Sequence, residues 1–151
     1  MSIQISKNVS DLCFRLLFCL IFLGLGAEHL FSDELIQKLM PQWIPAPRLV
    51  SIFTGLVLFA GGAMIALGYR LKWAAFLLGS FLVFVSILVH APAMASPEAS
   101  PLNPENKWIW DTLQRSNFVK NLCLLGVCLM LPHYQLGDWS LEAWLKRKDA
   151  S

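Results

Sequence analysis

The sequence has few charged residues and no long run of one charge. Charged residues make up 15% of the 151-residue chain, against about 25% in typical globular proteins. The net charge is +2, and the longest basic run is Lys146-Arg147-Lys148. Because nucleic-acid-binding domains present a concentrated basic face, this distribution argues against a nucleic-acid partner.

The sequence also lacks the short motifs that carry common chemistries. It contains four cysteines, Cys13, Cys19, Cys123 and Cys128, but no CxxC pair, so neither a dithiol site nor a zinc knuckle is indicated. There is no glycine-rich phosphate loop and no recognisable nucleophile–base pair. Since all four cysteines lie in apolar runs, we expect them to pack as small hydrophobic residues.

Long apolar runs are what the sequence does contain. Hydrophobic residues make up 56% of the chain, against roughly 45–50% in typical soluble proteins. The runs are long enough to cross a bilayer whose hydrocarbon core is about 30 Å thick. We therefore predict an all-α membrane protein, a single domain over residues 1–151 folded as an antiparallel bundle of four transmembrane helices. The spans are predicted at about residues 11–30, 49–69, 73–90 and 108–131.

The first apolar run has a competing interpretation as a cleaved signal peptide. Lys7 and Arg15 precede or enter an apolar run, and Gly24-Leu25-Gly26 resembles a cleavage site. Asp11 in the charged leader and the long polar lead-in favour a retained span instead. Arg15 lies one helical turn after Asp11, so the two side chains can form an ion pair.

The connections between the spans contain recognisable helix starts and stops. Ser32-Asp33-Glu34 predicts the start of a short interfacial helix in the first outer loop, which Pro41 ends. Arg70-Leu71-Lys72 is a tight turn, so the second and third spans should be antiparallel neighbours. Residues 91–104 hold four prolines and are predicted to exclude a regular helix.

The last apolar region has a helix-starting motif at one end and a helix-ending proline at the other. Asn103-Pro104-Glu105 predicts a helix cap, a first helical residue and an acid matched to the helix dipole. Pro132 is predicted to end that helix. Residues 137–148 are predicted to form a short amphipathic tail on the membrane surface, with Trp139, Trp144 and nearby leucines toward lipid.

Lysine and arginine residues fall unevenly on the two sides of this predicted topology. Because the side that holds both termini has more of them, the positive-inside rule places both termini in the cytoplasm. Tryptophans mark the two predicted interfaces. The outer ones are Trp43, Trp108 and Trp110, and the inner ones are Trp73, Trp139 and Trp144.

The predicted topology brings several polar groups to the same outer end of the bundle. In the last span, Asn117, Lys120 and Asn121 share one helical face, since they are spaced i, i+3 and i+4. An ammonium in hydrocarbon is costly, so Lys120 is predicted to face the interior and to pair with Glu28. The candidate ligand-binding residues are Glu28, His29, Trp43, Arg48, His90, Trp108, Asn117, Lys120 and Asn121.

Donors of this kind, capped by proline-rich loops, suit a small polar or quinone-like ligand. The donors would hold carbonyl oxygens while Trp43 or Trp108 stacks on the ring. The competing interpretation is that the histidines lie at headgroup level and the lysine snorkels to water. A metal site is disfavoured because adjacent Glu28 and His29 lie about 100° apart on a helix. Haem between His29 and His90 has no other support in the sequence.

Several short motifs together resemble the DoxX family of small membrane proteins over about residues 10–145. They occur in the expected order, with similar spacing. These are Glu28-His29-Leu30, Pro41-Gln42-Trp43-Ile44-Pro45, Gly68-Tyr69-Arg70, His90-Ala91-Pro92, Asn117-Phe118-Val119-Lys120-Asn121 and Gly137-Asp138-Trp139-Ser140-Leu141-Glu142.

The resemblance implies a four-helix bundle in the bacterial inner membrane. Some members of that family are tied to redox work, as a subunit of thiosulfate:quinone oxidoreductase or as partners of superoxide dismutase and a sulfurtransferase, and many have no assigned activity. The proline-rich segment of residues 91–107 is longer than the loop common in the family, and the lack of a paired cysteine motif argues against dithiol exchange.

Two functional hypotheses follow. The first is a redox-associated membrane subunit that binds a quinone or other small ligand at the outer polar cluster, an oxidoreductase subunit if it is an enzyme. It would work in the lipid bilayer with a redox protein partner or as a homo-oligomer; no metal and no cofactor other than a quinone is indicated. The second is a non-catalytic scaffold or assembly factor whose polar cluster locks the helices together.

Overall fold

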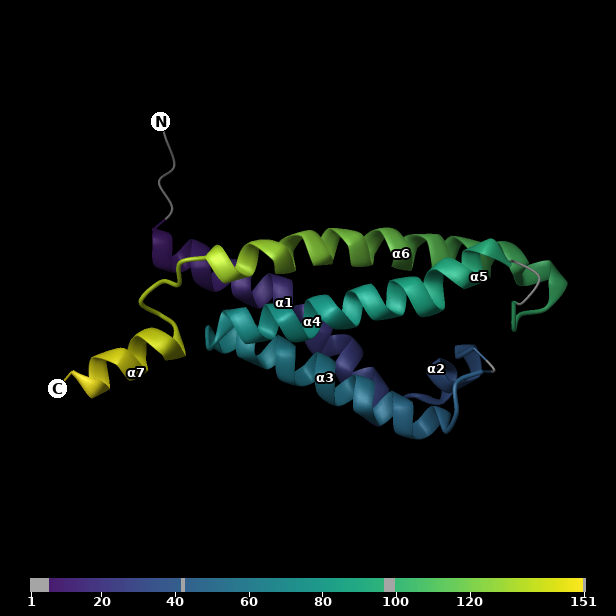
Figure 1. Ribbon diagram of the computed structural model, residues 1–151, viewed down its shortest axis with the longest axis horizontal. Coiled ribbons are helices and arrows are strands. Elements are labelled where there is room, and N and C mark those ends of the chain that lie inside the picture. The colour runs from purple at the N-terminus through teal and green to yellow at the C-terminus, as the bar shows by residue number, and fades with distance from the viewer. Residues whose placement is uncertain (1–5, 42, 97–99, 151) are drawn as a thin grey trace, which may run out of the picture.

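Long helices running side by side make up most of the molecule. The computed structural model describes residues 6–41, 43–96 and 100–150, and every regular element in these ranges is helical. Figure 1 shows the long helices aligned with the long axis of the molecule. They are α1 (Lys7–Phe31), α3 (Pro47–Leu67), α4 (Leu71–Val85) and α6 (Lys107–Met130).

Three helical stretches of the described chain are long and apolar enough to cross a membrane. These are Lys7–Phe31, Pro47–Leu67 and Leu71–Ala95. The prediction of an all-α membrane protein is therefore confirmed. The helix α6 is not among these three stretches; it carries four charged side chains, Lys107, Asp111, Arg115 and Lys120.

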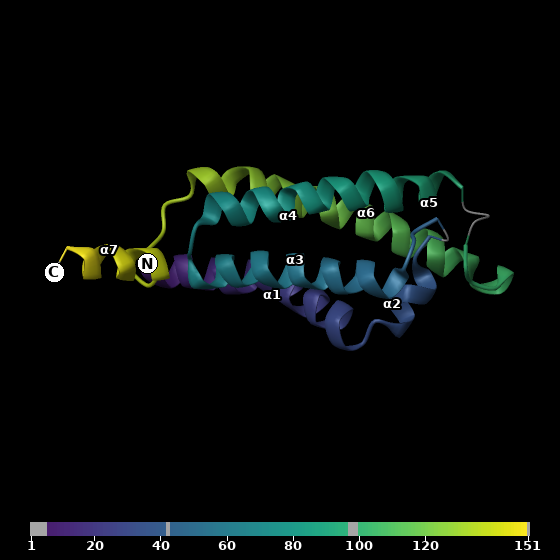
Figure 2. The ribbon, with the colours of Figure 1, turned by 60° about the horizontal axis from the view of Figure 1, so that its bottom comes forward.

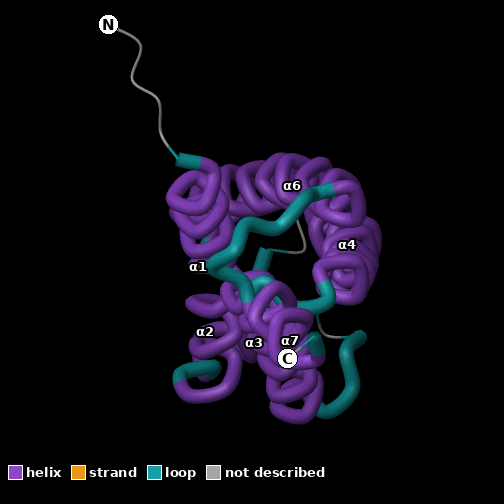
Figure 3. The backbone as a smooth tube through the Cα atoms, turned by 90° about the vertical axis from the view of Figure 1, so that its left-hand side faces the viewer, coloured by secondary structure: helices purple, strands orange, loops and turns teal. Residues whose placement is uncertain are grey.

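The helices pack in chain order. Helix α1 contacts α3, α3 contacts α4, and α4 contacts α6. Figure 3 shows this arrangement in a view along the long axis. The start of α1 and the short helix α7 (Leu141–Asp149) lie at one end, which we call the tail end (Figures 1 and 2). The helices α2 (Glu34–Leu39) and α5 (Ala91–Ala95) lie at the opposite end, which we call the loop end.

Glycines allow the closest helix approach, between α1 and α3. A Cβ atom on Gly26 would lie 3.0 Å from the backbone nitrogen of Phe59 and 3.1 Å from the oxygen of Gly55. A Cβ atom on Gly61 would lie 2.5 Å from Leu78 Cγ in α4. Small residues let two helix backbones approach in lipid, where packing is a main source of helix association. The helix α3 thus contacts both neighbours through glycine.

The buried apolar core runs between α1, α3, α4 and the end of α6. Phe22, Ile65 and Leu78 are at most 1% exposed. Cys19 and Cys128 are also buried in this core, while Cys13 and Cys123 are exposed, and all four cysteines are free. The outer surface of the bundle carries many exposed large apolar side chains, as lipid-facing helices do.

The prediction that the prolines of residues 91–104 exclude a helix is wrong at its start. The helix α4 continues through a π-helical turn, Ser86–His90, into α5, so the apolar helix ends at Ala95 rather than at residue 90. In this turn the N–H of Ala91 donates to the carbonyl of Ser86, five residues back. The wider turn changes the hydrogen-bond register just before Pro92, whose ring and missing N–H disfavour a regular α-turn.

The predicted start of the last helix is also shifted. Pro104–Asn106 form a 3-10 turn, and α6 begins at Lys107. The side chain of Asn103 makes no capping bond. Within the proline-rich segment, residues 97–99 lie outside the described residues, as does Gln42 in the first loop motif.

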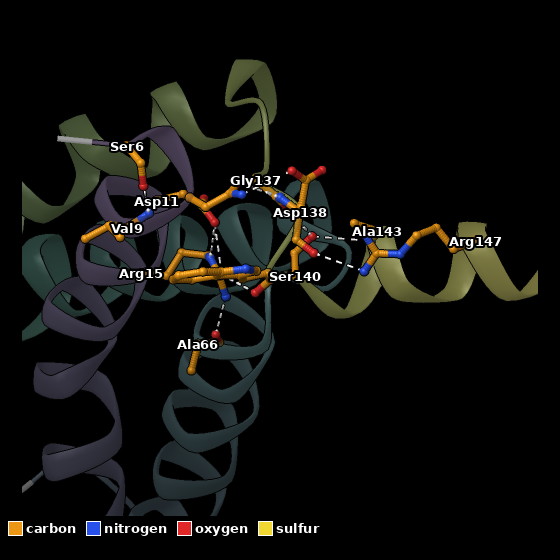
Figure 4. Close-up of polar contacts among 12 residues, drawn as sticks. Ser6, Val9, Asp11, Arg15, Ala66, Gly137, Asp138, Ser140, Ala143 and Arg147 are labelled. Carbon is orange, nitrogen blue, oxygen red and sulfur yellow. Dashed lines mark hydrogen bonds and ion pairs between the residues drawn. The ribbon is translucent and has the colours of Figure 1, made fainter. Parts of the chain in front are cut away.

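At the tail end, Arg15 of α1 holds three segments together. Its side chain forms an ion pair with Asp11 and donates hydrogen bonds to the backbone carbonyls of Ala66 and Trp139. Figure 4 shows Arg15 between Asp11 and Ala66. Both Arg15 and Asp11 are 1% exposed. The first helix, the end of α3 and the C-terminal segment therefore meet at one guanidinium.

The C-terminal segment rests on the turn between α3 and α4. Gly68 has a φ of 63°, and a Cβ atom there would lie 2.6 Å from Ser140 Cβ. The N–H of Glu142 donates to the carbonyl of Gly68, and the hydroxyl of Ser140 accepts from the N–H of Ala143 to cap α7. These contacts direct α7 beyond the bundle along its long axis (Figures 1 and 2).

Candidate functional site

His29, near the end of α1, is hydrogen-bonded to α3. Its Nδ1 lies 3.0 Å from the hydroxyl oxygen of Ser51, and that hydroxyl donates to the carbonyl of His29 at 3.1 Å. When the serine proton is directed to the carbonyl, Nδ1 of the ring donates the proton of the first contact. This tautomer leaves the lone pair of His29 Nε2 available, and the ring itself is half-buried.

The chain that follows α1 is held by a second ion pair. Asp33, at the N-cap position of α2, pairs with Arg48 of α3, and Arg48 also donates to the carbonyl of Leu30 at 3.3 Å. The hydrogen bond from Arg48 lowers the pKa of Asp33 to about 2. We call His29, Asp33, Arg48 and Ser51 the His29 group.

His90, the last residue of the π-helical turn, reaches α6. Its Nδ1 lies 2.6 Å from Oε1 of Gln114, so Nδ1 donates and Nε2 is again left with its lone pair. On the same helix, Lys120 donates to Asn117 Oδ1 at 2.8 Å and lies within electrostatic range of His90. We call His90, Gln114, Asn117 and Lys120 the His90 group.

The structure therefore gathers the predicted residues into two groups at the loop end. One joins α1 to α3, and the other joins the π-helical turn to α6. The predicted ion pair between Glu28 and Lys120 is wrong: Glu28 is exposed, and Lys120 donates to Asn117. Within the described part of the chain, no hydrogen bond or ion pair connects the two groups.

A cavity of about 650 Å³ lies at the loop end, next to the His90 group. Its walls come from α2 and the first loop, from the end of the π-helical turn and α5, and from the start of α6. It is lined by Lys38, Leu39, Met40, Pro41, Trp43, Leu88, Val89, Pro92, Ala93, Ser96, Ser100, Pro101 and Trp110. Its size and mainly apolar walls are typical of small-molecule sites.

Of the two tryptophans that were predicted to stack on a ligand, one lines the cavity and the other does not. Trp43 lines this cavity, as expected of a stacking residue, whereas Trp108 is 66% exposed and is not among the lining residues. Trp110 lines the cavity instead and is 5% exposed. Its indole Nε1 is buried without a hydrogen-bond partner, which is costly for a donor. Two residues along a helix separate these side chains by about 200°.

Sequence reasoning missed four residues that the structure places in or beside these groups. They are Asp33, Ser51, Trp110 and Gln114. Gln114 was detectable in principle, because Gln114, Asn121 and Cys128 are spaced by seven residues and are all buried on one face of α6. Ser51 gives no such signal, since a lone serine in an apolar span is common.

Among the described residues, no group of three or more His, Cys, Asp or Glu side chains is placed to hold a metal ion.

Asn121, another of the predicted binding residues, is buried in α6 at 6% exposure. Its position on the interior face agrees with the helical spacing read from the sequence.

Comparison with protein families settles what kind of protein this is. The DoxX family model matches residues 10–91. The chain belongs to the DoxX family. The matched part of this DoxX protein runs from α1 to the end of the π-helical turn and includes His29 and His90. No curated protein and no solved structure matched the chain.

Proposed function

We propose that this DoxX-family protein is a redox-associated subunit of the bacterial inner membrane that binds a quinone or another small ligand at the loop end. In this proposal α6 is the fourth span and both termini face the cytoplasm, so the loop end opens toward the outer leaflet. The excess of lysine and arginine at the tail end supports this orientation.

The observation that carries the proposal is that His29 and His90 both use Nδ1 for a contact inside the protein. In the tautomer with the proton on Nδ1, Nε2 is left with a lone pair. A neutral imidazole held in this way can accept a proton from a ligand hydroxyl. Leu88 and Val89, which immediately precede His90, line the cavity, while His90 itself is not among its lining residues; in this proposal a bound ligand reaches from the cavity to that ring.

The other residues have supporting roles in this proposal. Trp43 and Trp110 would provide the flat apolar walls that favour a ring. Lys120 would stabilise negative charge on a ligand oxygen near His90, since its ammonium already acts on that side chain. Arg48 and Asp33 would fix the first loop, and with it Trp43, over the cavity.

Purified protein in detergent tests the proposal. A lipid extract should contain quinone, and a short-chain benzoquinone added to extracted protein should quench tryptophan fluorescence with saturation. The variants His90→Ala and Lys120→Met should weaken this binding about tenfold or more, while His133→Ala, at the tail end, should not. Binding that is equal in all four proteins, or absent from all, would reject the proposal.

The scaffold hypothesis is supported by a different observation. The polar groups at the loop end largely satisfy each other: His29 with Ser51, Arg48 with Asp33, and Lys120 with Asn117. If these contacts only lock the helices, Lys120→Met should lower the melting temperature and yield of purified protein without any effect on a ligand. If His29→Ala, His90→Ala and Lys120→Met change neither property, both hypotheses fail.

A further inference from the structure

A second hollow lies on the outside of the bundle, and Leu88 lines both this hollow and the loop-end cavity. It is a groove of about 790 Å³ between α4 and the second half of α6. Its walls are almost entirely apolar. Its lining residues include Lys72, Ala75, Phe76, Gly79, Cys128 and Leu129.

Small residues form the floor of this groove and bulky ones its rims. Ala75 and Gly79 are buried at the bottom, and a Cβ atom on Gly79 would lie 3.5 Å from Cys128 Cβ. Phe76 and Leu129 on the rims are 69% and 67% exposed. An apolar groove with small residues on its floor and bulky apolar side chains on its rims fits a linear hydrocarbon chain.

The groove has one polar end. Lys72 lies in the first turn of α4, where the apolar stretch Leu71–Ala95 begins, and its neighbour Trp73 is 65% exposed. A lysine and a tryptophan at this position mark the boundary between hydrocarbon and headgroups. Within the described part of the chain, Lys72 forms no ion pair, so its charge is available to a ligand.

The length of the groove matches the same kind of ligand. From Lys72 in α4 to Leu88 in the π-helical turn, a rise of about 1.5 Å per residue gives about 24 Å. This exceeds the roughly 15 Å thickness of the hydrocarbon in one leaflet, so a complete acyl chain can lie in the groove while its headgroup stays at Lys72.

A second copy of the chain is a weaker candidate for this groove. In a symmetric dimer each copy would present the same face, and the two Lys72 ammonium groups would approach each other. No acidic residue lines the groove to offset that repulsion. The uncompensated positive charge favours an anionic occupant.

We propose that the groove between α4 and α6 is a binding site for one anionic phospholipid, with an acyl chain over Gly79 and the phosphate at Lys72. The charged end of this site, at Lys72, lies at the start of α4, and the proposal does not depend on the proposed function at the loop end. The site would hold a lipid of the leaflet at the tail end, and it would fill the hollow between α4 and α6 with hydrocarbon.

Native mass spectrometry of the full-length protein tests this proposal. After exchange into a mild detergent with phosphatidylglycerol and phosphatidylcholine in equal amounts, the wild type should retain one phosphatidylglycerol per chain. Lys72→Gln should lower the preference for phosphatidylglycerol about fivefold, the effect of one cation near an anionic headgroup. Gly79→Leu should reduce retention of both lipids, since it fills the floor of the groove.

Control variants and a soluble competitor test whether lipid retention depends on Lys72 and on the groove itself. Lys146→Gln, at the same end but outside the groove, should leave the lipid preference unchanged. Gly79→Ala, whose Cβ would make only ordinary contacts, serves if Gly79→Leu does not fold. Glycerol 3-phosphate alone should not compete, because the acyl chain provides most of the contact. Equal retention of both lipids by the wild type, or a dimer that Gly79→Leu abolishes, would overturn the proposal.

Discussion

Arg15 Nη2 and Asp11 Oδ2 lie 2.9 Å apart in an ion pair whose two side chains are each 1% exposed. The guanidinium also donates to the carbonyl of Trp139 at 2.7 Å, a residue near the opposite end of the sequence. One oxygen of the carboxylate, Asp11 Oδ1, is buried without a hydrogen-bond partner. The carboxylate thus depends on Arg15 for most of the compensation of its charge.

We expect Arg15→Met to destabilise the protein by about 3–5 kcal/mol, because it leaves the Asp11 carboxylate buried and unpaired. The double variant Asp11→Leu/Arg15→Met should recover much of that loss, since no buried charge is left behind. Thermal unfolding in detergent measures both. Arg115→Met, which removes an exposed arginine from α6, is the control, and an equal loss in that variant would contradict the assignment.

The glycines of α1 differ sharply in what surrounds them. Gly26 lies against the backbone of α3, whereas a Cβ atom on Gly24 would meet no other atom within 4 Å. We expect Gly26→Ala to cost about 1–3 kcal/mol, because the backbones must separate. Gly24→Ala should be neutral or stabilising by up to about 1 kcal/mol, since alanine favours the helix. Melting temperatures of the two variants should differ in this order; the reverse order would show that α1 does not pack through Gly26.

The ion pair between Asp33 and Arg48 should make stability depend on acid pH. The pKa of Asp33 falls from 3.8 to about 2 in the folded protein, so the folded state favours the carboxylate. Its contribution is present above pH 4 and is lost as the pH falls from about 4 to about 2. We expect melting temperatures of the wild type and Asp33→Asn to converge over that range. A constant difference down to pH 2 would mean that Asp33 is not perturbed.

Gln114 should fix the tautomer of His90. We expect Gln114→Leu to cost about 1–3 kcal/mol, because it leaves the Nδ1–H of a half-buried ring without an acceptor. The nitrogen-15 NMR spectrum of labelled histidine should show His90 protonated at Nδ1 in the wild type and as a tautomer mixture in the variant. Gln135→Leu, at an exposed position of the tail end, should alter neither the spectrum nor the stability.

Parts of the candidate site were predictable because helical spacing is local. The sequence placed Asn117, Lys120 and Asn121 on one face of α6, and the structure buries Asn121 and half-buries the other two. Spacing alone could not distinguish Trp108 from Trp110. That distinction depends on which face of α6 meets α4 and the loops, and the neighbours set that face.

Other parts required the three-dimensional structure. The proline-rich segment was predicted to break the helix after residue 90, but a π-helical turn carries it on to Ala95. The partner of Lys120 was predicted from charge to be Glu28 and is Asn117, one turn away on the same helix. Charge pairing across a bundle depends on helix rotation and crossing, and neither can be read from composition.

The amino-acid sequence by itself determined that this protein is an all-α membrane protein, because a continuous apolar run long enough to cross a bilayer satisfies its backbone hydrogen bonds as a helix, whereas barrel strands alternate apolar and polar residues. It also determined the local pairing of Asp11 with Arg15 and predicted a tight turn at Arg70-Leu71-Lys72, which the structure places slightly earlier, between Leu67 and Leu71. Only the tertiary structure decided that Arg15 reaches the C-terminal segment, that the polar residues form two groups, and that Trp110 lines the cavity. Contacts between segments distant in the chain depend on how the helices pack, and packing is a property of the whole molecule.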